Sequence, residues 1–284
     1  MANLKELRNR ISSVSSTMQI TSAMKMVSAA KLKRAQDAIV EMRPYSEKLT
    51  ALISNVSATL DTSENPYAEA RDVERVLIVP MTSNRGLCGA FNSSIIKRSM
   101  AAARKLEAQG VEVELFTVGK KATELMGREM DMAGSDLEVA AEVYYEGAAD
   151  IATLAMEGFL SGKYDRVVMV YNQFKNAAVQ LIQEETLLPI AQPEGQAGGD
   201  YLYEPSKNEL LAELIPTSIK SQVYKALLDS QASEHGARMT AMHKATDNAT
   251  ELRDGLKLQY NKARQAAITN EILEIVGGAE ALAG

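Results

Sequence analysis

The sequence has few of the residues that build disulfide-bonded, aromatic or membrane-spanning proteins. Its 284 residues include one cysteine and no tryptophan, and aromatic residues make up 5%. A single cysteine, Cys88, excludes an intrachain disulfide and favours a reducing compartment. The sequence has no run of about 18 apolar residues, as a membrane-spanning helix would require. The start MANLKELRNR also lacks the apolar core of a secretory signal. We therefore expect the protein to stay in the compartment where it is made.

Glycine (17) and proline (7) are also scarce, whereas methionine is common (14). Flexible, unbranched methionine side chains suit helices that pack on helices. The net charge of −6 is unevenly distributed, since residues 1–48 carry +5 and residues 49–205 carry −10. The basic segment could face phosphate or an acidic protein surface, but its charges form no dense run with interleaved aromatics. We therefore do not expect a nucleic-acid partner.

The first 60 residues carry a heptad repeat. Seam residues recur at alternating steps of three and four up to Met42, and the register resumes after Pro44. A spacing of 3.5 residues over several heptads predicts a left-handed coiled coil, and Pro44 predicts a kink. The predicted seam consists of Leu4, Leu7, Ile11, Val14, Met18, Thr21, Lys25, Ser28, Leu32, Ala35, Ile39, Met42, Leu49, Ile53, Val56 and Leu60.

A second long helix is predicted from Thr217, just past Pro216, to Val276. This stretch contains no proline and only two glycines. The pair Gly277 and Gly278 is expected to end the helix. The predicted apolar stripe, richer in alanine and methionine than the first, consists of Leu228, Ala232, His235, Met239, Met242, Ala245, Ala249, Leu252, Leu256, Tyr260, Ala263 and Ala267.

Between the two helices, short apolar runs alternate with helical patterns, which predicts a small, mostly parallel, Rossmann-like α/β sheet with an antiparallel edge. The predicted strands are 75–80, 111–119 and 164–174, with 164–174 forming a hairpin with 177–190. The predicted helices are 91–110, a weak one over 119–130, and 147–162.

Length sets the expected architecture. A helix over residues 4–60 spans about 85 Å at 1.5 Å per residue, whereas a compact chain of this size is about 50 Å across. We therefore predict a long antiparallel two-helix coiled coil, formed by the N- and C-terminal segments, with a central α/β domain. The expected division is residues 1–60, 61–205 and 206–284.

The stretch ITSAMKMVSAAKLKRA, residues 20–35, has no clean polar face. Thr21, Lys25 and Ser28 occupy consecutive seam positions, where polar residues weaken a coiled coil. Met24 and Met26 point elsewhere. Because two helices can bury only one face of each other, this packing predicts that another protein surrounds the pair.

Several candidate sites favour a structural interpretation. The loop TSNRGLCGAFN, residues 82–92, lies where α/β proteins bind phosphates, but it matches no phosphate-binding motif, so a tight turn is preferred. The histidines lie eight residues apart without further ligands nearby, which does not fit a metal site. The paired carboxylates and the histidines, namely Glu184 with Glu185, Glu271 with Glu274, and His235 with His243, imply no catalytic pocket. We predict no catalytic residue, cofactor or metal.

One polar cluster favours a functional interpretation. Arg264, Gln265, Thr269 and Glu271 lie near the end of the last predicted helix, among alanine and isoleucine. Long polar side chains in such surroundings are typical of a hydrogen-bonding patch for a partner.

Five motifs resemble the γ subunits of F-type ATP synthases, and the resemblance covers the whole chain. They are ITSAMKMVSAAKLKRAQ, SNRGLCGAFN, YLYEP, ARMTAMHKATDNA and YNKARQAAITNEILEIVGGA. The last fits the family's C-terminal signature at Ile268, Thr269, Glu271, Glu274, Gly278 and Ala279.

The resemblance implies a non-catalytic rotor shaft, present once per complex, inside a ring of α and β subunits. It implies an α/β domain beside the ε subunit and the membrane ring of c subunits, and a bacterial protein peripheral to the cytoplasmic face of the inner membrane. Ion flow would drive rotation, and rotation would drive ATP synthesis at the β subunits. The cysteine-bearing insert of the chloroplast version is missing, so thiol regulation is not expected.

The same resemblance gives roles to named residues. Arg264, Gln265, Thr269 and Glu271 would form a catch that hydrogen-bonds to β-subunit loops. Met24 and Lys25 would lie on the part of the shaft that the ring encloses. Tyr201 and Glu204 would belong to the foot, in contact with ε or the c ring. Two rival functions are a nucleotide-binding α/β enzyme and a self-associating coiled-coil scaffold.

Overall fold

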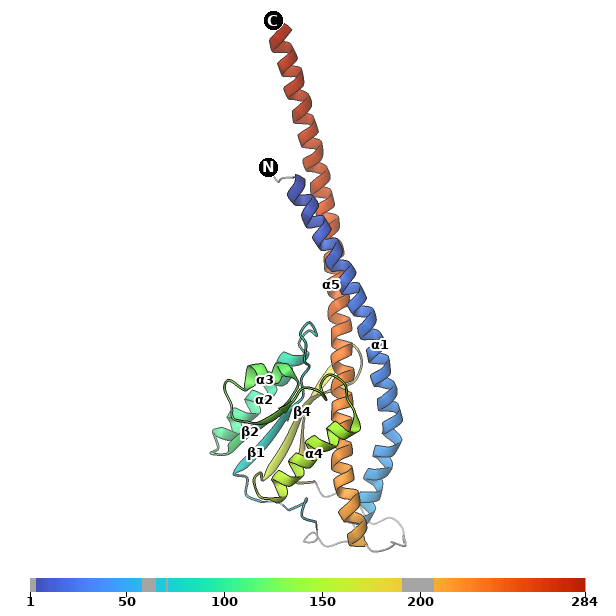
Figure 1. Cartoon of the computed structure of the whole chain (residues 1–284), viewed down its shortest axis with the longest axis vertical. Helices are drawn as coiled ribbons and strands as arrows, with labels where there is room; N and C mark the ends of the chain where they lie inside the picture. Colours follow the sequence, from blue (N-terminus) through green and yellow to red (C-terminus); the bar gives the residue numbers. More distant parts are fainter. Residues whose placement is uncertain (1–3, 58–64, 70, 191–206, 284) are drawn as a thin grey trace. The chain divides into compact units, whose positions relative to one another are not determined.

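The computed structural model describes residues 4–57, 65–69, 71–190 and 207–283 (Figure 1). The chain forms two compact units, one made of residues 1–27 and 239–284 and the other of residues 28–238. Two long helices, α1 (Leu4–Ser57) and α5 (Lys207–Ala283), contribute residues to both units. The expected domain boundaries near residues 60 and 205 lie outside the described residues and stay predictions.

The unit 28–238 contains a five-stranded sheet with the order β3-β2-β1-β4-β5. All neighbouring strands are parallel except β4 and β5, which form the expected antiparallel hairpin. In register, Ile78 of β1 pairs with Leu115 of β2 and Val168 of β4. The strands are β1 (Arg75–Pro80), β2 (Glu112–Val118), β3 (Met132–Asp136), β4 (Arg166–Phe174) and β5 (Gln180–Leu188).

Helices cover both faces of this sheet, as its doubly buried central strand requires. Because successive side chains of a strand point to opposite faces, Ile78 joins the core beneath α2 and α3, and Leu77 joins the core beneath α4 and α5. Figure 1 shows these helices around the strands. The helices are α2 (Phe91–Glu107), α3 (Lys120–Met126) and α4 (Tyr145–Leu160).

The segment of α5 from Ala226 to Arg238 is enclosed on nearly all sides. Every side chain in it is buried or half-buried. Ser233 Oγ donates to the carbonyl of Asn172 in β4 at 2.9 Å, and a Cβ at Gly236 would lie 3.2 Å from Ala177 Cα. A helix buried all round belongs to a core, so this segment is part of the α/β core.

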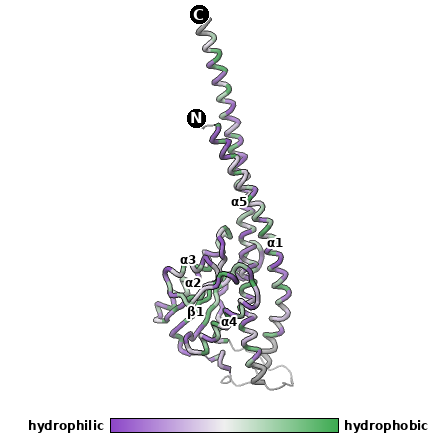
Figure 2. Tube along the Cα trace, in the orientation of Figure 1, coloured by the Kyte–Doolittle hydropathy of each residue, from purple (hydrophilic) through white to green (hydrophobic). Residues whose placement is uncertain are grey.

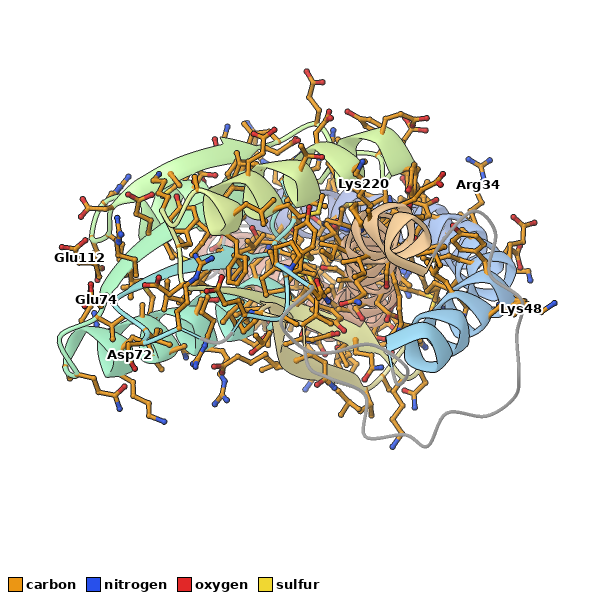
Figure 3. All side chains as sticks on the ribbon, turned by 90° about the horizontal axis from the view of Figure 1, so that it is seen from below. Arg34, Lys48, Asp72, Glu74, Glu112 and Lys220 are labelled. Carbon is orange, nitrogen blue, oxygen red and sulfur yellow. The ribbon has the colours of Figure 1, made fainter. Side chains whose placement is uncertain are left out.

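Several labelled charged side chains lie at the surface of the unit 28–238. Figure 3 shows Asp72, Glu74 and Glu112 gathered at one edge of the α/β layers. Arg34 and Lys48 project outward from α1 in the same view. These labelled acidic and basic side chains therefore lie on different parts of this unit.

In the unit made of residues 1–27 and 239–284, α1 and α5 run antiparallel. Along the contacts between them, the residue numbers of α1 rise while those of α5 fall by nearly the same amount, as in an antiparallel pair. The contacts are Arg8 Nη2 to Tyr260 Oη (2.9 Å), Thr250 Oγ1 to Met18 Sδ (3.3 Å) and Thr246 Oγ1 to Thr21 Oγ1 (2.8 Å).

The heptad prediction for α1 is confirmed wherever side chains are described. Every predicted seam position from Leu4 to Leu49 is buried or half-buried. The side chains of Ile53, Val56 and Leu60 lie outside the described residues. The helix continues through Pro44, and a kink there stays a prediction.

The predicted stripe of α5 is wrong at Leu252, which is 53% exposed, and at Ala267, which is also exposed. The half-buried Arg253 lies in the seam instead, with Nη1 3.5 Å from Met18 Sδ. The long stem of arginine packs like an apolar side chain while its charge reaches solvent. The seam of α5 therefore runs from Ala249 to Arg253 and then to Leu256. It contains Arg253 although the neighbouring Leu252 is more apolar.

The predicted ends of α5 are also wrong. The helix begins at Lys207, ten residues before Thr217, and includes Pro216. It passes through Gly277 and Gly278 to Ala283, and neither glycine has a positive φ. Glycine costs a helix about 1 kcal/mol relative to alanine but does not forbid it. The sequence analysis also missed strand β3.

Candidate functional site

The candidate site is the last part of α5, from Arg264 to Ala279. Every side chain in this stretch is exposed. In the antiparallel pairing, the position opposite Arg264 is that of Leu4, the first described residue of α1. Beyond Arg264 no described residue covers α5. Figure 2 shows that this end of the helix mixes hydrophobic with hydrophilic positions.

Large apolar side chains form one face of this stretch. At 100° per residue they cover an arc of about 160° around the helix. An apolar arc of that width is typical of a helix that packs against another surface. The five side chains are Ile268 (48% exposed), Ile272 (54%), Leu273 (63%), Ile275 (67%) and Val276 (50%).

The four predicted catch residues are all exposed on this stretch, and they fall into two pairs. By helical angle, Gln265 and Thr269 lie within the apolar arc, about 40° apart. Arg264 and Glu271 lie just outside one edge of the arc, about 20° apart. The helix thus places neutral hydrogen-bonding groups inside the apolar face and a charge of each sign beside it.

Met24 and Lys25 lie on α1, in the other half of the helix pair. Both side chains are half-buried, and Lys25 occupies a seam position. Three exposed apolar side chains lie close to them, namely Ile20 (60% exposed), Met26 (65%) and Val27 (58%). Single exposed apolar residues are ordinary, but these share one face of α1. This part of α1 therefore has a second apolar face besides the seam.

The predicted foot residues Tyr201 and Glu204 lie outside the described residues. Within the described ranges, no helix has a stretch both long and apolar enough to cross a bilayer.

The loop after β1 forms a tight turn that is held by its own side chains. Its base is closed by Asn92, whose side chain accepts from the Ser83 amide at 2.9 Å and donates to Ser83 Oγ at 2.9 Å. Positive φ values of 64° at Leu87 and 60° at Gly89 turn the chain. Cys88 is buried, and this burial raises the pKa of its thiol. A buried cysteine with a raised pKa is a poor nucleophile.

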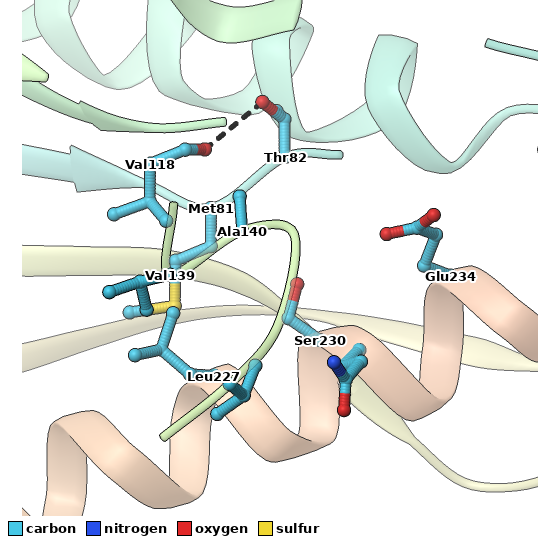
Figure 4. A pocket seen from close by; sticks show the side chains of 10 residues that line it. Met81, Thr82, Val118, Val139, Ala140, Leu227, Ser230 and Glu234 are labelled. Atoms are coloured by element: carbon cyan, nitrogen blue, oxygen red, sulfur yellow. Dashed lines mark hydrogen bonds between the residues drawn. The ribbon is translucent and has the colours of Figure 1, made fainter. Parts of the chain in front are cut away.

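A small cavity lies at the carboxyl ends of β1 and β2, where α/β proteins bind ligands. Figure 4 shows Met81, Thr82 and Val118 on one side of it and Leu227, Ser230 and Glu234 of α5 on another. Its volume is about 10 Å³, room for about one water molecule and far below the 300–1,000 Å³ typical of ligand pockets. Side chains of α5 line one side of the cavity, and the acidic Glu234 would repel a phosphate.

Three of the other titratable side chains that the sequence analysis considered have ion-pair or hydrogen-bond partners. Glu184 pairs with Arg98 at 2.8 Å, and Glu185 accepts from Tyr171 Oη at 2.8 Å. His243 lies 3.2 Å from Asp247, whereas His235 is buried. Among the residues that the structure describes, no three His, Cys, Asp or Glu side chains converge as metal ligands would.

The sequence analysis missed a buried ion pair between Glu234 and Arg238. The Nη2–Oε1 distance is 2.5 Å, and the side chains are 14% and 10% exposed. Arg238 Nη1 also donates to the carbonyl of Gly86 in the loop. The sequence does contain a signal for this pair, because Glu234 stands four residues before Arg238 on a predicted helix. The nearby Ala232 and His235 were predicted to be packed, which indicates that the pair would be buried.

These features define a class of protein with a five-stranded α/β sheet and two long helices, one of which ends in an exposed amphipathic segment. A family model described as ATP synthase matches residues 3–282. The ATP synthase gamma chain of Christiangramia forsetii is 60% identical over 287 aligned residues, with 100% of both chains covered. The chain belongs to the family of ATP synthase gamma chains.

Solved structures have the same fold. A chain in the Tetrahymena thermophila mitochondrial ATP synthase, in a structure titled central stalk/cring, is 28% identical with a TM-score of 0.59. The match covers 80% of this chain and 99% of that one. A chain of the Euglena gracilis mitochondrial ATP synthase is 23% identical with a TM-score of 0.67, covering 98% and 94%.

Proposed function

We propose that this chain is the central rotor stalk of an F-type ATP synthase. It turns inside the hexamer of α and β subunits and couples ion flow through the c ring to ATP synthesis and hydrolysis at the β subunits. The ε subunit and the c ring are its further partners. Membership of the gamma-chain family and the central-stalk title of a solved relative support this proposal.

The observation that carries the proposal is the exposed stretch of α5 from Arg264 to Ala279. Five large apolar side chains there are about half exposed or more. An apolar helical face of this extent is typical of an interaction site. A surrounding ring of subunits would cover this face and would explain why the polar residues lie both inside and beside the apolar arc.

Within this role, Arg264, Gln265, Thr269 and Glu271 form the catch that hydrogen-bonds to β-subunit loops in one rotary state. Met24 and Lys25, beside the apolar face of Ile20, Met26 and Val27, form the bearing surface of α1. Tyr201 and Glu204 belong to the foot that contacts ε or the c ring. These assignments rest on the chain's family and on the exposure of the described residues.

The chain itself is non-catalytic in this proposal. The small size of the cavity at the sheet edge and the family's name as one chain of a larger enzyme support this assignment. The assembled complex would hold the chain at the cytoplasmic face of the bacterial inner membrane as a peripheral protein.

The test is affinity purification of the tagged chain from detergent-treated membranes. Co-purification of nucleotide-binding α and β subunits and of c subunits is the expected result, together with ATP-driven ion pumping after reconstitution into vesicles. Recovery of the chain as a homodimer without these subunits would overturn the proposal. Tight ATP binding by the purified chain alone, measured by calorimetry, would favour an enzyme instead.

A further inference from the structure

Glu234 lies at a meeting point of three elements in the unit 28–238. Its carboxylate pairs with Arg238 of α5. Burial raises the pKa of this carboxyl, while the positive charges of Arg238, Lys31 of α1 and Arg85 of the loop after β1 act in the opposite direction. A carboxylate removed from solvent needs such compensation. The carboxylate of Glu234 therefore interacts electrostatically with positive groups of α1, of α5 and of the loop after β1.

Arg238 connects this centre to the loop. Its Nη2 donates to Glu234 and its Nη1 donates to the Gly86 carbonyl. The planar guanidinium offers several donors in fixed directions, so one side chain can hold two acceptors at once. The contact reaches the tip of the loop, next to Leu87.

The loop is also tied to the carboxyl edge of the sheet. Asn84 Nδ2 donates to the Leu137 carbonyl at 2.7 Å, and Asn84 Oδ1 accepts from the Lys120 amide at 2.9 Å. Asn84 thus fastens one side of the loop to the segments after β2 and β3. Arg238 fastens the tip to α5.

The position of this contact along α5 suggests its role. Arg238 is the last residue of the unit 28–238, so the loop is held at the end of the part of α5 that belongs to this unit. Leu87, beside the held carbonyl, has a φ of 64°, a backbone conformation that residues with a Cβ rarely adopt. Such backbone conformations persist where surrounding contacts enforce them.

We propose that Arg238, oriented by Glu234, is a positioning residue that clasps the loop Ser83–Asn92 to α5, so that torque passes between the α/β layers and this helix without slippage. This role rests on the proposed rotor function. The clasp itself is a property of the chain alone and can be tested without partners.

Hydrogen–deuterium exchange of the purified full chain tests the clasp. Arg238→Gln and Glu234→Gln should each speed amide exchange at least tenfold at Ser83, Phe91 and Lys120, whose amides donate to acceptors in the loop. Exchange in β1 and β4 should stay unchanged. Arg238→Lys should give an intermediate rate, because lysine keeps the charge without the planar set of donors. Lys33→Gln is the matched control, since it breaks the exposed i,i+4 pair with Asp37 and should change nothing. Unchanged exchange at these three amides in both glutamine variants would overturn the clasp.

Torque transmission is tested in the assembled complex. The number of ions pumped per ATP hydrolysed should fall at least twofold in Arg238→Gln, while hydrolysis continues. If loop exchange rises but this ratio stays at the wild-type value, Arg238 is merely structural and the proposal is wrong. If Arg238→Gln does not fold, the double variant Glu234→Gln/Arg238→Gln, which leaves no unpaired charge, is measured in both assays under the same criteria. Failure of the wild-type chain to assemble with α and β subunits would instead overturn the rotor function.

Discussion

Two segments of α5 contrast sharply. The segment Ala226–Arg238 is enclosed by its own chain, yet it contains several polar and charged side chains that are buried or half-buried, among them Asp229, Ser233 and Glu234. The segment Arg264–Ala279 is covered by no described residue, yet it contains three isoleucines, a leucine and a valine. A chain selected only for its own stability would place these residues the other way round. The difference indicates that the exposed segment is shaped by a partner.

The largest difference in stability is expected between two variants that each introduce one negative charge, one in the enclosed segment and one in the exposed segment. Ala232 is 0% exposed, so Ala232→Glu buries an unpaired carboxylate and should destabilise the chain by about 4 kcal/mol or more. Ala267→Glu, on the exposed segment of the same helix, should change stability by less than about 0.5 kcal/mol. Urea denaturation of both purified variants measures this difference. Equal losses would mean that the exposed segment is covered within the chain.

The pH dependence of the enclosed segment gives the next largest effect. Burial, assisted by the positive charges of Lys31 and Arg238, lowers the pKa of His235 to about 4. As the pH falls, His235 is therefore protonated near pH 6.5 in the unfolded chain but only near pH 4 in the folded chain. The contribution of neutral His235 is complete above pH 6.5 and falls by up to roughly 3 kcal/mol as the pH drops to 4.

His235→Gln isolates this contribution. Glu234, whose pKa is raised by burial, acts in the opposite sense but is common to both proteins. The unfolding free energy of the wild type should therefore fall more steeply between pH 7 and pH 5 than that of His235→Gln. Parallel pH profiles for the two proteins would contradict a buried neutral histidine.

The exposed segment should respond in function, not in stability. Charge-assisted hydrogen bonds contribute about 1.5–3 kcal/mol each, and about 1.4 kcal/mol is a factor of ten in rate. Glu271→Ala should therefore slow ATP turnover of the assembled complex about tenfold, and Gln265→Leu, which loses a neutral bond, should slow it less. Asn270→Ala, on the face away from the apolar arc, is the control and should have no effect. Loss of assembly would make the residues structural, and normal turnover in both variants would exclude a catch.

The sequence predicted features that depend on periodicity. The heptad spacing located the seam of α1 because burial in a helix pair follows position more than polarity, so that even Thr21 and Ser28 are buried. The apolar run 75–80 predicted strand β1 correctly, because a central parallel strand is buried on both faces and is therefore apolar along its length. The exposed polar cluster near Glu271 was expected for the same reason, since it lies at the end of a predicted helix.

The features that the sequence did not reveal depend on contacts between distant residues. Strand β3, MAGSD, has no apolar run, and it forms because the backbone of β2 offers a free edge. Arg253 replaces Leu252 in the seam because the position of Met18 decides which side chain can reach it. The contact of Arg238 with Gly86 joins residues 152 positions apart, and no local pattern encodes it.

The smallest expected effect concerns an exposed apolar residue outside both segments. Leu87 is 67% exposed and has a φ of 64°, so its side chain gains little from burial while its backbone is strained. Glycine adopts this conformation without the Cβ clash but loses more entropy on folding. Leu87→Gly should therefore raise the unfolding free energy by about 1 kcal/mol or less, measured by urea denaturation. Asparagine also tolerates positive φ, so the unfolding free energy of Leu87→Asn should lie between those of the wild type and Leu87→Gly. A loss of stability in both variants would mean that Leu87 packs against its own chain and does not belong with the exposed apolar residues.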